Sequence, residues 1–541
     1  MRGLIMDQPQ LISNLLIHAD FVSGDREIVT RTVEGPIHRY TYHDAHRRAR
    51  QLANALQSLD VKLGDRIGTL AWNTYRHFEI YYAVSGIGAI THTLNPRLHP
   101  SQMTYIINHA EDAYIFVDLN LVGLIEAIES ELPKLRGVVI MTDRAHMPET
   151  SLTNALCYEE LVNGHSDDLE WPVFDENTAS SLCYTSGTTG NPKGALYSHR
   201  STMIHAYASA LPDVLHMGER EVILPVVPMF HVNAWGIPYG ATMVGAKLVF
   251  PGALLDGKSV HELLLAEDVT MTAGVPTVWL NLLNHWREAK TRVPSLKRVI
   301  IGGSACPESM IRAFQEEFGA EVRHAWGMTE MSPLGSVAIA KPRITNDAEA
   351  MRKQIKQGRP VYGVEMRIVD DAGKSLPHDG KAFGELQVRG PWITSGYFKL
   401  DHSEAHGKDG WFATGDVATI DEDGYMEITD RAKDVIKSGG EWIGTIEIEN
   451  HVMSHPDVLM AAVIGVPHPK WDERPLIVVV PKTDKSPTHG EITRFLDGKI
   501  AKWWMPDDTV LTDELPIGAT GKVLKAKLRE QFGNHKLPNG N

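Results

Sequence analysis

The chain has 541 residues, 43% hydrophobic and 22% charged, which is typical of globular proteins and enough for roughly two to four folding units. Its 53 basic and 68 acidic residues give a net charge of −15 without any dense Lys/Arg run, which excludes sequence-independent nucleic-acid binding. Its three cysteines are too few for a disulfide framework and lack the C-x-x-C spacing of a structural zinc site.

The first 16 residues predict a short amphipathic entry helix. An early Asp and Pro interrupt the apolar core that a signal peptide requires. No run of about 18 uncharged apolar residues follows, so we expect no membrane span. With so few cysteines, the chain is expected to be a reduced, cytoplasmic protein.

Helix-like and strand-like patterns then alternate as far as about residue 358. Residues 41–59 place Ala and Leu at helical spacing behind a Thr start, and residues 64–72 follow as a short apolar strand. Later strand-like segments, such as 269–276 and 296–303, end in Gly or Pro turns. This alternation is typical of βαβ units in parallel sheets, whose ligands lie at the carboxyl ends of the strands.

From about Arg359 the pattern changes to short strands separated by Gly turns, which predicts a β-rich subdomain over 359–430. A charge-dense segment follows, and we place a hinge at 431–434. Residues 435–541 are long enough for a small α+β domain. The predicted fold is α/β, with a large N-terminal domain (1–430) of parallel-sheet subdomains plus the β-rich subdomain, and a small mobile C-terminal domain.

A loop rich in hydroxyl groups, 184–194, follows an apolar strand-like segment. Its glycines, Gly187, Gly190 and Gly194, let the backbone approach a bulky anion, and Lys193 supplies positive charge. The hydroxyl side chains belong to Thr185, Ser186, Thr188 and Thr189. The alternative is an ordinary solvated turn, but this combination favours a phosphate site.

A second segment, Gly252–Ser259, literally matches the P-loop pattern G-x-x-x-x-G-K-S between a strand-like and a helix-like segment. Its interior fits poorly, because the Asp256 carboxylate would lie beside the phosphates and two leucines replace small residues. A loop over the sheet edge is the simpler interpretation. The alternative function is a P-loop ATPase or phosphotransferase using Lys258.

Five segments in chain order resemble the signature motifs of the acyl-adenylate-forming superfamily, which includes the acyl-CoA synthetases. They are the loop 184–194, the W-G-x-T-E segment 326–330, the T-G-D segment 414–416, the D-R pair 430–431 and the T-G-K segment 520–522. The resemblance spans about residues 20–530. Medium-chain fatty-acyl-CoA synthetases are the most similar group, and residues 90–98, 228–239 and 298–307 especially resemble bacterial 3-methylmercaptopropionyl-CoA ligases.

The resemblance implies a nucleotide site. Glu330, with Thr185, is expected to hold Mg²⁺ at the ATP phosphates, because Mg²⁺ prefers hard oxygen ligands. Trp326 beside Gly303 and Ser304 offers a flat adenine slot, although plain core packing would also explain it. The remaining nucleotide contacts are expected from Ala325, Gly327, Met328, Thr329, Asp416 on the ribose hydroxyls, and Arg431.

The resemblance also implies that the small domain moves. Lys522 is expected to enter the active site on closure and stabilise negative charge during attack on the α-phosphorus. Rotation about Lys433 would then remove it and complete a CoA tunnel lined by Lys437, Gly439 and Gly440. One departure is visible: Gly444 and Thr445 replace the usual Ser/Asn–Pro pair, while Glu447 remains. Altered loop stiffness is expected there.

The acid is expected to bind behind His231, which resembles the family's gating histidine, although a core histidine is the alternative. The predicted acyl pocket consists of Trp235, Gly302, Met331 and Pro333. The bulk of Trp235 suggests that the substrate is an acid with a short or medium acyl chain, plausibly 3-(methylthio)propionate. The implied function is an ATP- and Mg²⁺-dependent acyl-CoA ligase that forms acyl-AMP and then acyl-CoA. Adenylation with another acceptor is the nearest alternative, and a homodimer is expected because the family is often dimeric.

Overall fold

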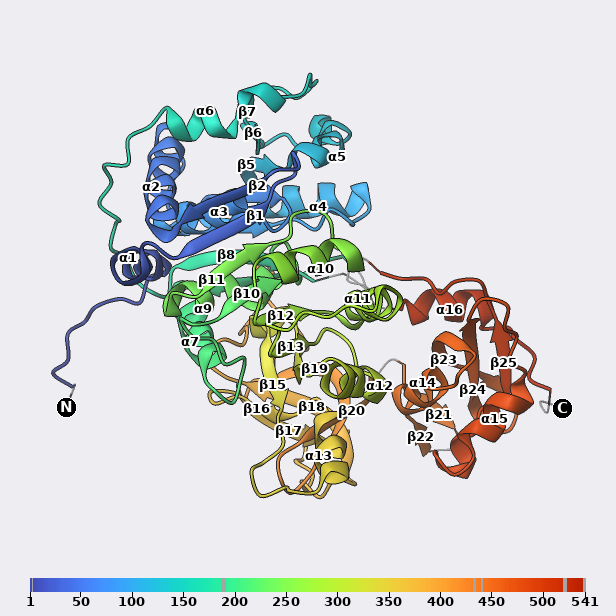
Figure 1. The fold of residues 1–541 in the computed structure, drawn as a ribbon. Coiled ribbons are helices and arrows are strands. Elements are labelled where there is room, and N and C mark those ends of the chain that lie inside the picture. The colour runs from blue at the N-terminus through green and yellow to red at the C-terminus, as the bar shows by residue number, and fades with distance from the viewer. Residues whose placement is uncertain (2, 186–190, 432–433, 439–440, 519–522, 539–541) are drawn as a thin grey trace.

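The computed structural model describes residues 1, 3–185, 191–431, 434–438, 441–518 and 523–538, with the backbone alone at 431, 441 and 442. Figure 1 shows a large body built on successive sheets and, beside it, a smaller C-terminal unit drawn in orange and red. None of the helices in these ranges has the length and apolar character needed to cross a bilayer.

The first sheet has seven strands and is buried on both faces, as parallel sheets between helices are. Almost every residue of its inner strands is buried, and Ile67, Ile115 and Val139 are fully so. Only β8 and β9 pair antiparallel. In sheet order the strands are β7 (Ala155–Cys157), β6 (Gly137–Ile140), β5 (Asp112–Val117), β3 (Arg66–Leu70), β4 (Ile90–Thr93), β8 (Ala179–Tyr184) and β9 (Gly194–Ser198).

The helices of this region are α2 (Tyr42–Ser58), α3 (Tyr75–Gly86), α4 (Pro100–Ala110), α5 (Val122–Glu126) and α6 (Tyr158–Asn163). Helix α2 begins where its Thr start predicts, because Thr41 and Asp44 form a reciprocal capping box. Helix α1 (Ile12–Ser23) begins later than expected. Residues before it are non-helical, in keeping with Pro9, whose ring disfavours the helical conformation at the preceding residue.

The second sheet has nine strands, parallel at its centre and antiparallel towards both edges. In sheet order the strands are β16 (Arg359–Pro360), β15 (Leu334–Ala338), β14 (Glu321–Gly327), β13 (Arg298–Ile301), β12 (Met271–Gly274), β10 (Val222–Pro225), β11 (Lys247–Phe250), β1 (Glu27–Arg31) and β2 (Ile37–Thr41). The helices in this stretch are α7 (His199–Ala210), α8 (Val232–Trp235), α9 (Ile237–Val244), α10 (Gly257–Ala266), α11 (Pro276–Ala289), α12 (Glu308–Arg312) and α13 (Asp347–Gln354).

The β-rich stretch is a four-stranded antiparallel sheet, as its Gly-punctuated sequence predicts. Its strands are β17 (Glu365–Val369), β18 (Phe383–Arg389), β19 (Phe412–Ile420) and β20 (Met426–Arg431). The first two residues of the predicted range form β16, which instead closes the edge of the nine-stranded sheet.

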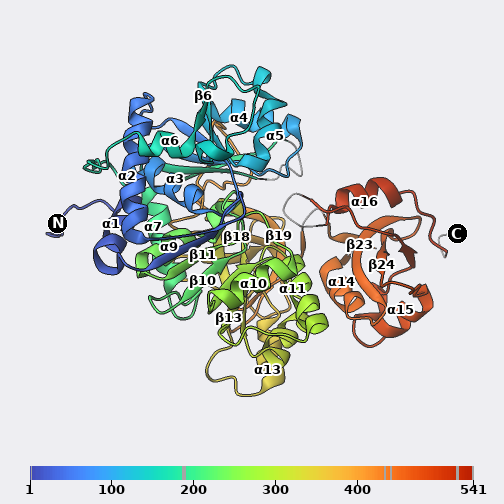
Figure 2. The same cartoon turned by 45° about the horizontal axis from the view of Figure 1, so that its top comes forward.

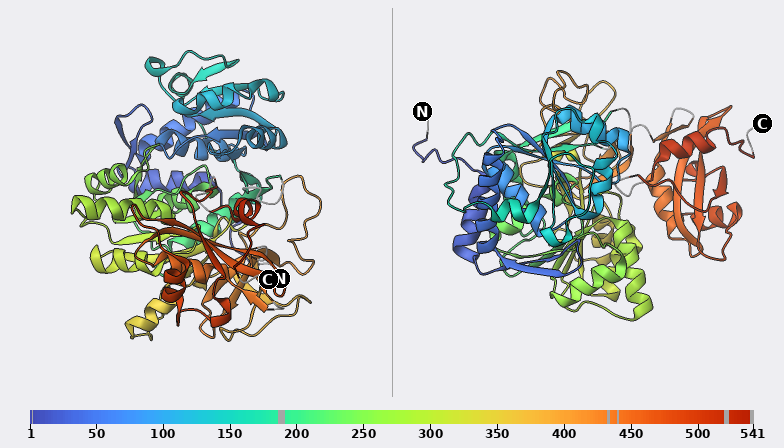
Figure 3. Two further views of the ribbon diagram at one scale, coloured as in Figure 1. Left: turned by 90° about the vertical axis from the view of Figure 1, so that its right-hand side faces the viewer. Right: turned by 90° about the horizontal axis from the view of Figure 1, so that it is seen from above.

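The C-terminal unit has its own core, centred on Ile436, Val463 and Ile477. Its strands are β21 (Ile436–Ser438), β22 (Glu441–Ile443), β23 (Val458–His468), β24 (Asp472–Pro481) and β25 (Asp508–Leu511), and its helices are α14 (Thr445–Met453), α15 (His489–Leu496) and α16 (Lys525–Phe532). Figure 2 and the right-hand view of Figure 3 show this unit beside the body, and in the left-hand view of Figure 3 it lies in front of the body. The predicted α/β class, with a large N-terminal domain and a smaller α+β C-terminal domain, is confirmed.

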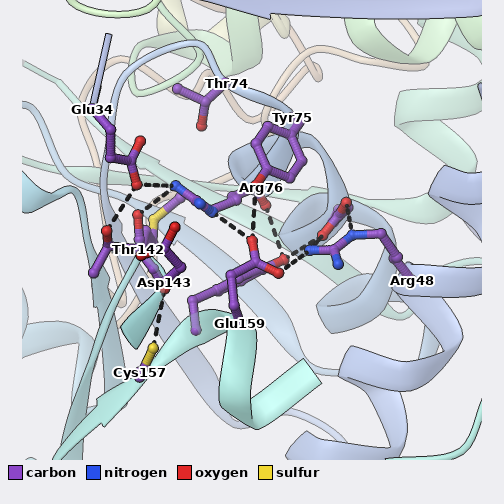
Figure 4. Close-up of polar contacts among 12 residues, drawn as sticks. Glu34, Arg48, Thr74, Tyr75, Arg76, Thr142, Asp143, Cys157 and Glu159 are labelled. Carbon is purple, nitrogen blue, oxygen red and sulfur yellow. Dashed lines mark hydrogen bonds and ion pairs between the residues drawn. The ribbon is translucent and has the colours of Figure 1, made fainter. Parts of the chain in front are cut away.

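A buried ionic network joins the β1–β2 hairpin to the seven-stranded region (Figure 4). Arg76 lies between two carboxylates, 2.7 Å from Glu34 and 2.8 Å from Glu159. Arg48 continues the network, 3.0 Å from Glu159 and 2.7 Å from the fully buried Glu79. The network therefore ties segments far apart in sequence into one rigid block.

The Gly444–Thr445 departure has a structural consequence. The Thr445 N–H donates a hydrogen bond to Asp430 Oδ2 at 2.7 Å, which proline could not do. The Thr445 hydroxyl also contacts Lys525 Nζ, which pairs with Glu449 at 2.8 Å. Residue 445 thus links β20 to the C-terminal unit through bonds that a proline would remove.

Candidate active site

The neck of the hydroxyl-rich loop lies at the end of β8. Tyr184 and Gly194 are the last paired residues of β8 and β9. Beyond them, the Thr185 N–H donates to the Lys193 carbonyl at 2.9 Å, and the Lys193 N–H donates to the Thr185 hydroxyl at 3.2 Å. Ser186, Gly187, Thr188, Thr189 and Gly190 lie outside the described residues. The neck places the loop at the carboxyl end of a strand that pairs parallel with β4, where ligands bind in such folds.

Close packing explains why Gly194 is a glycine. A Cβ there would lie 2.9 Å from a Leu182 methyl group and 3.3 Å from the Tyr184 ring. Tyr184 is itself held on two sides: its hydroxyl oxygen lies 2.6 Å from His109 Nδ1, and its ring centroid lies 5.1 Å from that of His92. The neck of the loop is therefore closely packed and held in position by its neighbours.

His92 is in turn oriented by Asp112, whose carboxylate lies 2.8 Å from its Nδ1, and both side chains are fully buried. The pair spans the intervening strand over Gly68, where a Cβ would approach Asp112 Oδ2 to 3.1 Å. Burial raises the pKa of Asp112, and the neighbouring His92 opposes that shift.

Glu330 lies in the turn after β14 and is buried. Its Oε1 accepts a hydrogen bond from the Tyr397 hydroxyl at 2.7 Å, and the Lys193 ammonium lies 5.1 Å from the centroid of the Tyr397 ring. The network therefore joins Thr185, Lys193 and Glu330 into one site. Sequence reasoning missed Tyr397, whose only signal is an aromatic residue between Gly396 and Phe398.

The predicted nucleoside residues also converge. Trp326 Nε1 donates to Asp416 Oδ2 at 3.2 Å, which joins the expected adenine and ribose contacts from β14 and β19. Asp416 is the register partner of Arg431 in β20. Gly303, with φ +82°, and the exposed Ser304 follow β13, the neighbour of β14.

The turn from 327 to 333 is closely packed. A Cβ at Gly327 would lie 1.9 Å from the Pro333 carbonyl oxygen, to which the Met328 N–H donates at 3.1 Å. The Thr329 carbonyl accepts from the buried Tyr197 hydroxyl. Ala325 precedes this turn in β14.

The expected acyl residues form a second group beside the first. His231 precedes an unusual left-handed turn in which Val232 to Gly236 all have positive φ. This turn directs Trp235 towards Gly302, where a Cβ would lie 3.1 Å from the Trp235 ring and 2.8 Å from the Ala325 carbonyl oxygen. Met331 is fully buried and, like Trp326, packs against Gly335. Gly302 is therefore the residue that lets Trp235 approach β14.

The P-loop alternative is not supported by the geometry of Gly252–Ser259. Asp256 caps α10, accepting the Ser259 N–H at 3.0 Å. Its carboxylate thus occupies the position that a phosphate would take at this helix start. A Cβ at Gly257 would lie 2.4 Å from the Asn281 carbonyl oxygen, so this glycine serves helix packing instead.

Of the residues expected from the small domain, the structure describes Lys437. Lys437 is exposed on β21, and its backbone N–H donates to Glu473 at 3.0 Å. Lys433, Gly439, Gly440 and Lys522 lie outside the described residues.

Among the described residues, no group of three or more His, Cys, Asp or Glu side chains is arranged to hold a metal ion. Glu330 and Thr185 nevertheless suit Mg²⁺, since both offer hard oxygen atoms and belong to one network. Mg²⁺ at nucleotides keeps several waters and needs only one or two protein ligands besides phosphate.

Comparisons with known proteins give two family matches. Residues 19–398 match the family described as AMP-binding enzyme, and residues 447–522 match the AMP-binding enzyme C-terminal domain. A 3-methylmercaptopropionyl-CoA ligase of Ruegeria lacuscaerulensis is 52% identical, covering 98% of this chain and 99% of its own. A medium-chain-fatty-acid–CoA ligase of Ectopseudomonas oleovorans is 48% identical, covering 99% and 98%.

Solved structures agree with the fold. An anthranilate CoA ligase in complex with anthranoyl-AMP superimposes with a TM-score of 0.86 at 25% identity, covering 98% of this chain and 99% of its own. ATP-bound MatB from Rhodopseudomonas palustris gives a TM-score of 0.81 at 25% identity, covering 96% and 99%.

Proposed function

Because this chain belongs to the AMP-binding enzyme family and is an AMP-forming acyl-CoA synthetase, we propose that it joins CoA to a short- or medium-chain carboxylic acid, with 3-(methylthio)propionate as the candidate. The first step makes acyl-AMP and pyrophosphate from the acid and ATP. The second transfers the acyl group to the CoA thiol and releases AMP. The observation that carries the site assignment is the network joining Thr185, Lys193 and Glu330.

In the proposed first step, the loop 185–193 receives the ATP phosphates through backbone N–H groups, hydroxyls and Lys193. Asp416 accepts the ribose hydroxyls, and Trp326, fixed by its bond to Asp416, lines the adenine slot. Glu330 and Thr185 would hold Mg²⁺, which neutralises charge on the phosphates when bound. His231 admits the carboxylate, which attacks the α-phosphorus.

The C-terminal unit would supply a positive charge that is present in the first step and absent from the site in the second. Lys522 stabilises the developing negative charge on the α-phosphate, and its departure after rotation at Lys433 stops the reverse reaction. Lys437, Gly439 and Gly440 then line the CoA path. Keeping water out until the thiol arrives protects the reactive mixed anhydride, which gives the rotation its purpose.

The acyl size follows from Trp235. Its ring lies beside Gly302, and we infer that the indole closes the acyl pocket where a long chain would continue. The names of the two relatives, which specify a methylthio acid and medium-chain acids, support the same size class.

We therefore expect kcat/KM to peak at short or medium acids. In a panel of C2–C10 acids and 3-(methylthio)propionate followed by AMP release, decanoate should fall roughly tenfold or more below the best acid, because hydrophobic pockets discriminate by about 1–3 kcal/mol per methylene. Trp235→Ala should move the optimum to longer acids, whereas Trp503→Ala, exposed in the C-terminal unit, should not. An optimum that stays in place in Trp235→Ala would refute the assignment of Trp235.

A homodimer is proposed as well, in a compartment that supplies ATP and CoA, such as the cytoplasm. Leu4, Ile5 and Met6 precede α1 with almost fully exposed side chains, and an apolar arm of this kind favours cover by another chain. The three cysteines are free and buried, which suits a reducing compartment. Sedimentation should give twice the chain mass of 60.0 kDa, and a species at the single-chain mass would contradict the dimer.

A further inference from the structure

One side chain outside all the predicted motifs contacts both charged groups of the candidate phosphate site. The Tyr397 hydroxyl donates to Glu330 Oε1 at 2.7 Å. The Lys193 ammonium lies over the ring of the same tyrosine, 5.1 Å from its centroid, which is within the range of a cation–π contact. The two contacts use different parts of one phenol.

The residues that follow extend this arrangement to the loop neck and to α4. The Phe398 N–H donates to the Gly194 carbonyl at 2.8 Å, directly after Lys193. Lys399 Nζ lies 2.9 Å from the His109 carbonyl oxygen and 3.0 Å from the Glu111 carboxylate. Three consecutive residues therefore bridge the Glu330 turn, the loop neck and the helix that packs on Tyr184.

The local backbone and packing fix the tyrosine. Lys399 has φ +55°, a conformation that persists in a non-glycine residue only when its surroundings hold it. His406 packs edge-on against the Tyr397 ring, with centroids 5.3 Å apart at 84°.

We propose that Tyr397 is a positioning residue for adenylation, orienting the Glu330 carboxylate with its hydroxyl and the Lys193 ammonium with its ring before ATP binds. The Glu330 carboxylate is buried and the Lys193 side chain is exposed, and opposite charges at one site attract each other. Giving each a contact on the same rigid phenol fixes their relative position and keeps them available for phosphate and cation. This inference rests on the proposed function, which places ATP at this loop.

The test separates the two contacts. Tyr397→Phe keeps the ring and removes the hydroxyl, and Tyr397→Leu removes both. ATP–pyrophosphate exchange measures adenylation, synthetic acyl-AMP plus CoA measures thioester formation, and titration calorimetry with a non-hydrolysable ATP analogue measures binding without turnover. Tyr362→Phe, 90% exposed, is the matched control.

Because a hydrogen bond to a charged group contributes about 1.5–3 kcal/mol, Tyr397→Phe should lower the exchange rate about 10- to 100-fold. Its analogue affinity should stay within about threefold of the wild type, because the ring contact with Lys193 remains. Tyr397→Leu should weaken analogue binding by a further ~3- to 30-fold. Thioester formation from supplied acyl-AMP should be unchanged in both, which a merely structural role would not produce.

Glu330→Gln distinguishes this inference from the proposed function. If Glu330→Gln loses exchange but Tyr397→Phe does not, the positioning role is wrong and the phosphate site stands. If Glu330→Gln exchanges at the wild-type rate, the assignment of Glu330 itself fails. Equal losses in both half-reactions, with a lowered unfolding midpoint in Tyr397→Phe, would show a structural role and also overturn the inference.

Discussion

Replacing Lys522 with alanine is expected to lower the rate of adenylate formation by about 10²–10³-fold, because one positioned charge at a developing anion typically contributes that much. Conversion of supplied acyl-AMP and CoA to acyl-CoA should remain near the wild-type rate, since Lys522 is proposed to have left the site by then. The measurement is ATP–pyrophosphate exchange compared with thioester formation from synthetic acyl-AMP.

Two other lysines serve as controls. Lys527 is exposed on α16, near the same end of the chain, and Lys527→Ala should change neither half-reaction. Lys258 belongs to the P-loop-like segment, where Asp256 caps the helix, so Lys258→Ala should also be inert. A Lys522→Ala enzyme with wild-type exchange would refute the role of Lys522. Release of ADP by the wild-type enzyme, together with loss of activity in Lys258→Ala, would favour the P-loop alternative.

The parts of the site that sequence reasoning anticipated are local in the chain. The strand, neck and glycine of 184–194 are adjacent residues, and the capping box that starts α2 spans four positions. The family resemblance implied that Trp326 and Asp416 contact one nucleoside, but the hydrogen bond between them, across 90 residues, was not predicted.

The parts that sequence reasoning missed are contacts between distant residues without a local signature. Tyr397 meets Glu330 across 67 residues, and His109 meets Tyr184 across 75. Neither contact leaves a pattern in the sequence, because Tyr397 and His109 look like an ordinary loop residue and an ordinary helix residue. The left-handed turn after His231 was missed for a related reason. Positive φ usually indicates glycine, but Asn233 and Ala234 have positive φ here and are not glycines.

The Gly444–Thr445 departure was visible in the sequence, but its contacts were not. The sequence predicts altered stiffness there, which stays a prediction. The structure shows a hydrogen bond from the Thr445 N–H to Asp430, and a proline at this position could not donate it.

Removing the charge of Arg76 is expected to produce the largest loss of stability. Arg76→Met keeps most of the side-chain volume but leaves Glu34 and Glu159 without their shared cation (Figure 4). The Arg76 side chain is only 7% exposed, and breaking a buried ion pair by removing one partner costs about 3–5 kcal/mol. Urea unfolding should show this decrease in the free energy of unfolding. The matched control is Arg312→Met, whose exposed pairs with Glu308 and Glu316 should contribute little to stability.

The pH dependence of the difference in unfolding free energy between the wild type and Arg76→Met gives an independent test. Burial disfavours the ionised form of Glu159, but Arg48 and Arg76 outweigh that effect and lower its pKa. A carboxyl whose pKa is lower in the folded state stabilises the fold above its unfolded pKa, about 4.3, and loses that contribution as the pH falls through the folded value. The stability difference between wild type and Arg76→Met should therefore be complete near neutral pH and shrink on acidification below that value. A stability difference that does not change with pH would show that Arg76 acts through packing. A loss of stability in Arg76→Met no larger than that in Arg312→Met would show that the network adds nothing beyond surface ion pairs.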